Sequence, residues 1–352
     1  MSTYTISKIY DGDKKTQDLA DKLLSSEKLK RDKNLDYRCV MLDDNLNVIA
    51  TGSCFGNTLR CIAVSSKYQG QGLLNEIITH LIQVQFSRHN SHIFLYTKYC
   101  NANFFKDLGF YEIIKIENHL VFMENKKTGF SNYLEGLKTG LNLSFENKKK
   151  RAAIVINANP FTLGHLYLIE KACSENDWVH IFIVSEDTSL VPFNIRKQLL
   201  IEATKHLTNI SYHDSGPYII SNSTFPSYFQ KDEESVIKGH TLLDISIFKK
   251  IANVLNITTR YVGEEPTSFV TNLYNDSMKK LLPENNIECI VVPRKEINNS
   301  IISASTVRQA IKEGDFKRLK TLVPQTTYDF FASENAIDVI KKIKKEENII
   351  HY

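Results

Sequence analysis

Residues 152–165 decide the fold, and they read AAIVINANPFTLGH. The first five residues are all apolar, which is typical of a parallel strand buried on both faces. A helical stretch follows from Gly164 to Ser174, and a second apolar run lies at Val179 to Val184. Strand, helix and strand at this spacing predict a βαβ unit, and therefore an open α/β sheet. Further strands are expected at Thr259 to Val262 and at Cys289 to Pro293.

The loop after the first strand brings three residues to the start of the predicted helix. Thr162 and His165 are three positions apart, so they meet on one face of its first turn. Gly164 removes a side chain where a bulky ligand must lie against the backbone. The helix N-terminus adds free N–H donors beside the carboxyl end of a strand, where ligands of open α/β sheets collect. The arrangement suits nucleotide phosphates and the charge that develops during displacement at the α-phosphorus.

A second motif lies far along the chain, where residues 302–308 read ISASTVR. It opens another helix, again with hydroxyls at the N-terminus. Arg308 follows one turn in, where its guanidinium can fork two phosphate oxygens. Ser303 and Ser305 supply two of these hydroxyls.

The two motifs resemble the (His/Thr)-x-Gly-His and Ile-Ser-x-Ser-x-x-Arg motifs of the nucleotidyltransferase superfamily. Their order and their strand–loop–helix context agree with that superfamily. The resemblance implies that Thr162, His165 and Arg308 are catalytic, with His165 stabilising the transition state. Upstream, a Gly-(Gly/Ser/Thr)-Phe-Asp-Pro turn is usual, and residues 157–160 depart from it by reading NANP. The other residues expected at the ATP phosphates are Asn157, Asn159, Pro160, Phe161 and Gly164.

The first half of the chain contains a different phosphate-type loop. A strand at Arg60 to Val64 leads to KYQGQG at residues 67–72 and then to an amphipathic helix from Leu73 to Gln85. Glycines two apart allow close backbone approach to an anion, and the following helix start offers N–H groups to a phosphate. An ordinary turn is the alternative reading of this motif taken alone. Downstream, residues 101–110 read NANFFKDLGF, a short helix ended by a glycine.

This pair of segments resembles motifs A and B of the GCN5-related N-acetyltransferase fold over about residues 1–125. The loop begins with Lys67 where the family has Gln or Arg. The resemblance implies a groove for CoA or a CoA-like arm, bound by Lys67, Gly70, Gly72 and Asn101. It does not imply acetyl transfer, because no residue of the first half can be identified as a general base. Glu76, His80 and His92 are candidates, but core or surface roles are more typical of such residues.

The expected fold class is therefore α/β, in two domains. Residues 1–128 form a GCN5-related N-acetyltransferase-like α+β domain, residues 129–150 a linker, and residues 151–352 a Rossmann-like nucleotidyltransferase domain with a parallel sheet. From about Tyr37 to Glu124 the sequence predicts strand, strand, strand, helix, strand, helix, strand, strand. The basic residues 148–151 are expected to be solvated in the linker.

The combination of domains is similar to the citrate lyase ligase family over essentially the whole chain. The shared segments include residues 159–162, 215–221, 224–229 and 262–268. The resemblance implies an acid–thiol ligase that acetylates the thiol of a phosphoribosyl-dephospho-CoA group on the acyl-carrier subunit of citrate lyase. The implied partners are acetate and that carrier; the implied cofactors are ATP, cleaved to AMP and diphosphate, and Mg²⁺ held on the triphosphate. Acetyl-adenylate is the implied intermediate.

Further roles follow for segments outside the two motifs. Gly263 and Glu264, in a 263–265 turn, are expected around the adenosine, with an ordinary strand-end turn as the alternative. Residues 215–221 and 224–228 are expected to close over acetate and exclude water. Arg196 can serve phosphates too, but a surface ion pair is the default reading.

There are four rival functions, and the intact residues of the phosphate site argue against the second and the third of them. A nucleotidyltransferase making a small cofactor would consume a phosphomonoester and ATP without acetate. An acetyl-CoA-dependent acetyltransferase would need a decayed second domain, and a non-catalytic assembly factor would bind the carrier without turnover. A related ligase for another acyl-carrier lyase or decarboxylase would share the same chemistry.

Composition excludes several classes of protein. The chain has 352 residues and 42% hydrophobic residues, enough for two cores, and its net charge of +4 argues against a surface built for nucleic acid or anionic membrane. The six cysteines lack metal or disulfide spacing and are expected to be reduced, buried thiols, so no metal site is expected. No apolar run reaches the ~18 residues of a membrane span, and we expect a cytoplasmic protein.

Overall fold

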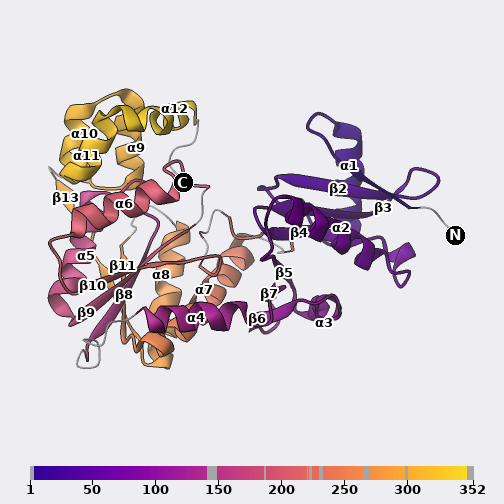
Figure 1. Ribbon diagram of the computed structural model, residues 1–352, viewed down its shortest axis with the longest axis horizontal. Helices are drawn as coiled ribbons and strands as arrows, with labels where there is room; N and C mark the ends of the chain where they lie inside the picture. The colour runs from indigo at the N-terminus through magenta and orange to yellow at the C-terminus, as the bar shows by residue number, and fades with distance from the viewer. Residues whose placement is uncertain are drawn as a thin grey trace. The chain divides into compact units, whose positions relative to one another are not determined.

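The computed structural model describes residues 4–140, 149–185, 188–219, 221, 224–229, 233–264, 269–297 and 300–346. The chain forms two compact units (Figure 1). The first unit comprises Met1–Asn132 and Pro226–Leu243, and the second comprises Tyr133–Phe225 and Asp244–Tyr352. In sequence, the Pro226–Leu243 segment of the first unit therefore lies between two segments of the second unit.

The first unit is built on a seven-stranded sheet in the order β1-β2-β3-β4-β5-β7-β6. Neighbouring strands are antiparallel except β4 and β5, which are parallel. The succession predicted from Tyr37 to Glu124 is confirmed, and a strand and a helix precede it. The elements are β1 (Thr5–Lys8), α1 (Lys14–Ser26), β2 (Tyr37–Leu42), β3 (Val48–Phe55), β4 (Thr58–Val64), α2 (Leu73–Ser87), β5 (Phe94–Lys98), α3 (Ala102–Asp107), β6 (Tyr111–Ile116) and β7 (Leu120–Glu124).

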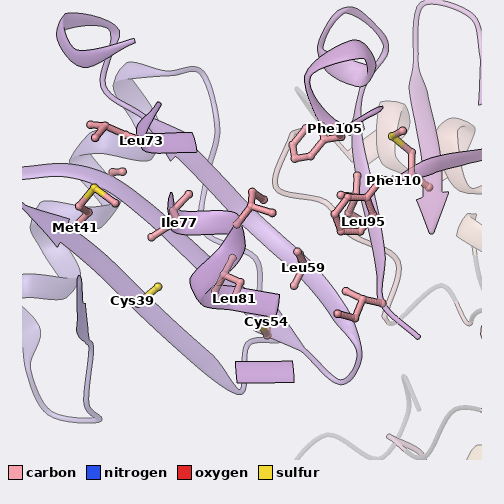
Figure 2. Close-up of a cluster of buried hydrophobic side chains, with 14 of the residues drawn as sticks. Cys39, Met41, Cys54, Leu59, Leu73, Ile77, Leu81, Leu95, Phe105 and Phe110 are labelled. Atoms are coloured by element: carbon pink, nitrogen blue, oxygen red, sulfur yellow. The ribbon is translucent and has the colours of Figure 1, made fainter. Parts of the chain in front are cut away.

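Helix α2 covers one face of this sheet. Its buried residues Ile77 and Leu81 lie among apolar side chains of β2 to β4, including Met41 and Leu59 (Figure 2). A Cβ placed on Gly52 of β3 would lie 2.8 Å from the Leu81 Cδ1, so a larger residue there would force the Leu81 side chain to shift. Side chains alternate between the two faces of a strand, so this packing fixes which residues of β4 and β5 face α2.

The second unit contains a five-stranded parallel sheet in the order β10-β9-β8-β11-β12, which confirms the predicted parallel sheet. From β8 the chain first builds outward through β9 and β10, and later adds β11 and β12 on the other side of β8. The point where the direction reverses, at the carboxyl ends of β8 and β11, is where open α/β sheets bind ligands. The strands are β8 (Arg151–Ile156), β9 (Trp178–Ile183), β10 (Ile210–Asp214), β11 (Thr259–Gly263) and β12 (Glu288–Val292).

Helices and a small β-ribbon complete the chain. Helix α4 lies within the segment that sequence analysis expects to link the domains, and both α4 and α7 cross from one unit's residues to the other's. None of the described helices has the length and apolar character that crossing a membrane requires. These elements are α4 (Gly129–Thr139), α5 (Leu163–Glu175), α6 (Phe193–Thr204), α7 (Glu233–Leu255), α8 (Phe269–Leu281), β13 (Glu296–Ile297), β14 (Ser300–Ile301), α9 (Ala304–Glu313), α10 (Phe316–Leu322), α11 (Gln325–Ala332) and α12 (Ile337–Lys345).

Two smaller predictions are wrong in part. Arg151 is not a solvated linker residue: it begins β8, is buried, and donates through Nη1 to the carbonyl of Leu255. The six cysteines are all free, but Cys100 is exposed and Cys289 only partly buried. Cys100 lies in the short turn between β5 and α3.

Candidate active site

The N-terminus of α5 lies at the sheet's switch point and is capped reciprocally. Thr162 is the N-cap residue, and its Oγ1 accepts the backbone N–H of His165 at 3.2 Å. In return, the His165 Nδ1 accepts the backbone N–H of Thr162 at 3.1 Å. This is a capping box in which a histidine takes the place of the usual Glu or Gln. Thr162 and His165 therefore orient each other, as their spacing predicts.

The hydrogen bonds of His165 determine its protonation. Because Nδ1 accepts a backbone N–H, the proton of the neutral ring is on Nε2, which is left as a donor. Burial, together with the positive charges of Arg294 and Arg308, lowers the pKa of His165 to about 4. Near neutral pH the ring is therefore a neutral Nε2–H donor beside two cations, a group suited to an anionic ligand.

Arg196 anchors the loop that leads to this helix. Its side chain is fully buried, so the default reading of a surface ion pair is wrong. Its Nε donates to the carbonyl of Val191 at 3.0 Å, and its Nη1 donates to the carbonyl of Val184 at 2.9 Å and to Asn157. The guanidinium is buried because backbone carbonyls at strand and loop ends supply its acceptors.

We expect Arg196→Met to lower the free energy of unfolding by about 3–5 kcal/mol, because it leaves several buried carbonyl oxygens without donors. Chemical denaturation followed by the fluorescence of Trp178 measures the change. Arg318→Met is the matched control: Arg318 forms an exposed ion pair with Glu313 at 3.5 Å and should change stability by less than about 0.5 kcal/mol. Equal effects of the two variants would contradict the anchoring role.

The residues between β8 and α5 have distinct environments. Asn157 uses its side-chain oxygen to accept from Ser189 and Arg196, so it supports the loop. Ala158 has a left-handed φ of 52° and is buried, a strained conformation of the kind found at functional sites. Phe161 belongs to the hydrophobic core of the second unit, and Pro160 is buried. These residues shape the loop, and their side chains serve the fold.

Asn159 is different, because part of its buried side chain has no hydrogen-bond partner. Its Oδ1 accepts the backbone N–H of Val191 at 3.0 Å, which fixes the orientation of the amide. Its Nδ2 is fully buried and has no partner within the described residues. A buried donor without an acceptor costs about 1–3 kcal/mol, which a ligand's oxygen would recover.

Arg308 connects the two motifs directly. It lies in the first turns of α9, is fully buried, and donates through Nη1 to the carbonyl of Asn159 at 2.5 Å. Its Nη2 donates to the Ser305 Oγ at 3.3 Å, and burial lowers the pKa of the guanidinium to about 10. Ser303 caps α9 by accepting the backbone N–H of Thr306 at 3.0 Å. Residues nearly 150 positions apart therefore meet at one site.

Gly164 explains how the two helix N-termini approach each other. A Cβ at this position would lie 3.3 Å from the carbonyl oxygen of Ile302 and 3.4 Å from the Thr162 Oγ1. The sequence analysis expects a ligand to lie against the backbone of Gly164. In the structure the segment before α9 lies there instead. The absence of a side chain lets α5 and α9 bring their positive ends to the same place.

Gly263 and Glu264 follow β11 at the other side of the switch point, and both are exposed. The Gly263 carbonyl accepts from the Asn275 side chain at 3.2 Å, and the Glu264 N–H donates to the carbonyl of Val292. Glu265, the third residue of the expected adenosine turn, lies outside the described residues.

The first unit holds a cavity of about 600 Å³ where the CoA-like arm is expected. Gly70, Gly72 and Asn101 line it, whereas Lys67 is not among its lining residues. Gly72 is the N-cap of α2 and, like Gly70, has a left-handed backbone with open space around its Cα. The loop therefore presents bare backbone to the cavity.

Comparison with known families identifies the chain. A family model of the citrate lyase ligase C-terminal domain matches residues 151–331, and one of the acetyltransferase (GNAT) family matches residues 6–110. The [citrate [pro-3S]-lyase] ligase of Klebsiella pneumoniae is 33% identical over 323 residues, covering 90% of this chain and 93% of the relative. The chain belongs to the citrate lyase ligase family. The Haemophilus influenzae ligase of the same name is 35% identical, covering 90% of this chain and 96% of its own. The Escherichia coli ligase is 36% identical, covering 80% and 81%.

In this member of the citrate lyase ligase family, sequence reasoning missed Arg294. It lies two residues after β12, and its Nε donates to the Glu264 carbonyl at 2.8 Å while its Nη1 donates to the Ile302 carbonyl at 3.4 Å. Arg294 therefore joins the end of β11 to the segment before α9, and its charge acts on His165. The sequence did contain one indication of this role, because Arg294 follows a predicted parallel strand and ligands bind at the ends of such strands.

In the segments expected to close over acetate, the described residues make contacts within the fold, and closure over acetate stays a prediction. Ser215 accepts the backbone N–H of Ser185 and donates to the Ile219 carbonyl, so its hydroxyl ties loop ends together. The placement of Tyr228 in the second domain is corrected. Tyr228 belongs to the first unit, and its hydroxyl donates to the Tyr96 carbonyl of β5. Ile220, Asn222 and Ser223 lie outside the described residues.

Two histidines considered as bases in the first unit have partners. The His80 Nε2 lies 2.7 Å from the Tyr37 hydroxyl, and the His92 Nε2 lies 2.6 Å from the Glu124 carboxylate. Glu76 and His80 line a smaller, open pocket. Among the described residues, no group of three or more His, Cys, Asp or Glu side chains could hold a metal ion.

Proposed function

We propose that this chain acetylates, with ATP, the thiol of the phosphoribosyl-dephospho-CoA group on the acyl-carrier subunit of citrate lyase, through acetyl-adenylate. The observation that carries the proposal is the meeting of two capped helix N-termini at the sheet's switch point, joined by the bond from Arg308 to the Asn159 carbonyl. Membership of the citrate lyase ligase family supports the identity of the acceptor.

In the first step an acetate oxygen attacks the α-phosphorus of ATP, and the bond to the β-phosphate oxygen breaks. This yields acetyl-adenylate and diphosphate. The His165 Nε2–H, the guanidinium of Arg308 and that of Arg294 are the donors and charges that stabilise the developing negative charge. Ser303 and Ser305 at α9 would hold the departing diphosphate, and Thr162 keeps His165 aligned.

In the second step the carrier thiol attacks the acetyl carbonyl, and AMP leaves with the electrons of the broken C–O bond. The thiol's proton leaves with the departing AMP or with solvent. Mg²⁺ is expected to enter on the triphosphate and to neutralise part of its charge. The donor set of Nε2–H, guanidinium and hydroxyl groups fits phosphate oxygens. The proposal also includes acetate as the substrate, Mg²⁺ as the cofactor, and contacts of Gly263 and Glu264 with the adenosine.

The first unit would receive the prosthetic arm. Its cavity is large enough for a pantetheine-type chain, and Gly70, Gly72 and Asn101 lie along it. The free N–H groups at the start of α2 suit the arm's diphosphate. Lys67, just before the loop, would contribute charge from outside the cavity lining.

The direct test incubates the chain with the prosthetic-group-bearing carrier, ATP, Mg²⁺ and acetate, and follows the carrier by mass spectrometry. The proposal predicts one added acetyl group per carrier and formation of AMP. An unchanged carrier mass with folded protein and all substrates present would refute it.

A variant of the glycine loop separates the two functions. We expect Gly70→Asp to weaken acetylation of the carrier thiol by about tenfold or more, because a carboxylate there repels the arm's diphosphate and a left-handed backbone is strained in Asp. Acetate-dependent ATP–pyrophosphate exchange should be unchanged.

Gly12→Asp is the matched control. Gly12 also has a positive φ of 97° and open space around its Cα, and it does not line the cavity. This variant should keep both activities. Loss of both activities in Gly70→Asp, with both retained in Gly12→Asp, would rule out the division of labour.

A further inference from the structure

Strands β4 and β5 of the first unit separate toward their carboxyl ends. In the described chain their pairing joins Thr58 to Phe94 and Leu59 to Leu95 and stops there, although β4 continues to Val64. The cavity lies beside the separated ends, since Ile62 to Val64 and Lys98 line it. Beyond these two pairs no ladder joins β4 to β5 in the described residues, and we call the space between their carboxyl ends the slot; like the sheet, it has two faces.

The cavity lies mainly on one face of this slot, and Glu27 and Leu29 of the loop before β2 also line it. Leu59 and Leu95 belong to the hydrophobic cluster that α2 packs on (Figure 2), and Leu73 of α2 and Phe105 of α3 line the cavity. This is the face from which a thiol-ended arm would enter.

Tyr228 lies on the opposite face. Side chains alternate along a strand, so Arg60 and Tyr96, next to Leu59 and Leu95, point away from α2. The Tyr228 hydroxyl donates to the Tyr96 carbonyl at 2.5 Å, and the Tyr228 carbonyl accepts the backbone N–H of Lys30 at 2.9 Å. Tyr228 is 5% exposed, and burial, together with the neighbouring Cys61, raises its pKa well above the usual value although the charge of Arg60 acts in the opposite direction.

The loop of residues 27–32 completes the cover. Lys98 of β5 donates to the Lys28 carbonyl at 3.2 Å, and Asp32 forms a buried ion pair with Arg60 of β4 at 2.9 Å. Glu27 accepts the backbone N–H of Ser66, next to the phosphate loop, at 2.9 Å. The loop thus spans both strands, and Tyr228 fills the place where they part.

We propose that Tyr228 is a stopper that closes the far face of the slot to a second substrate, so that the first unit holds a thiol-ended arm without transferring its acyl group there. This inference rests on the proposed binding of the arm. An acyl acceptor must come within about 3–3.5 Å of the thioester carbonyl. With the arm on one face, only the face that Tyr228 covers remains for it.

The cysteines of the first unit report on the stopper. Cys61 is 1% exposed beside Tyr228, and burial raises the pKa of its thiol to about 12. Cys100 is exposed and serves as the reactive reference, while Cys39 is buried in the cluster under α2 and serves as the protected one. Alkylation by iodoacetamide, followed at each cysteine by mass spectrometry, measures their accessibility in the whole chain.

We expect Tyr228→Gly to speed alkylation of Cys61 by at least about tenfold while Cys39 stays protected. Tyr228→Phe keeps the ring and should leave Cys61 protected. If circular dichroism shows that Tyr228→Gly is unfolded, Tyr228→Leu replaces it and should give a smaller rise. Two results would overturn the proposal. One is that Cys61 reacts as fast as Cys100 in the unaltered chain, and the other is that Cys61 stays protected in a folded Tyr228→Gly or Tyr228→Leu variant.

The activity test uses acetyl-CoA and a small primary amine. The unaltered chain should bind acetyl-CoA, measured by calorimetry, and release CoA no faster than the uncatalysed reaction; enzymatic formation of the acetylated amine would overturn the proposal. Absence of acetyl-CoA binding would instead overturn the proposed arm site, while Cys61 protection would still decide whether the slot is closed.

Discussion

The His165→Ala variant is expected to lose about 10²–10³-fold of the rate of ATP–pyrophosphate exchange in the presence of acetate. The variant removes the Nε2–H donor that the bond from the Thr162 N–H to Nδ1 leaves available. That donor is preorganised by the capping box and is partly buried beside Arg294 and Arg308. A water molecule in its place would therefore stabilise the transition state less. Initial exchange rates with labelled pyrophosphate measure the effect.

His206→Ala is the matched control, because His206 is exposed and bound to Glu170 at 3.1 Å. It should exchange at the normal rate. Loss of the helix cap in His165→Ala should cost about 1 kcal/mol of stability, so a thermal melt distinguishes this cost from the catalytic loss. A folded His165→Ala variant that exchanges within about twofold of normal would remove His165 from the mechanism.

Arg308→Lys should lower the same exchange by about 10²–10³-fold although the positive charge is kept. The guanidinium bonds the Asn159 carbonyl and the Ser305 hydroxyl at once, and a single ammonium group cannot reproduce this fork toward a phosphate. The loop between β8 and α5 would also lose its link to α9. The exchange rate and its dependence on ATP concentration measure the effect.

Arg318→Lys, on α10, is the control for Arg308→Lys, because the side chain of Arg318 forms an exposed ion pair with Glu313. It should leave exchange and stability unchanged. Full activity of a folded Arg308→Lys variant would show that the fork has no part in phosphate binding.

Most of the second unit's sheet was predictable because its evidence is local. An apolar run such as residues 152–156 can be read as a buried strand without knowing its neighbours, and four of the five strands were predicted in this way. Strand β10 was not predicted, because residues 210–214 read ISYHD and contain no such run. Helix α4 was not predictable in the same way, since residues 129–139 mix polar and apolar residues within a polar stretch. Its helical state depends on packing that the local sequence does not specify.

The parts of the site that sequence did not indicate depend on long-range contacts. Arg196 resembles any arginine on an exposed helix until three backbone carbonyls from two loops are placed around it. Arg294 has no motif, and its role follows from the proximity of β11, β12 and the segment before α9. Tyr228 packs against strands more than 130 residues earlier in the chain, which no local pattern reveals.

The most direct test of the central claim is ATP–pyrophosphate exchange by the unaltered chain with Mg²⁺, with and without acetate and without any carrier. The account predicts exchange that requires acetate, because the carboxylate is the group that displaces diphosphate from the α-phosphorus. Exchange that needs a phosphomonoester and ignores acetate would contradict it and would assign the site to synthesis of a small cofactor.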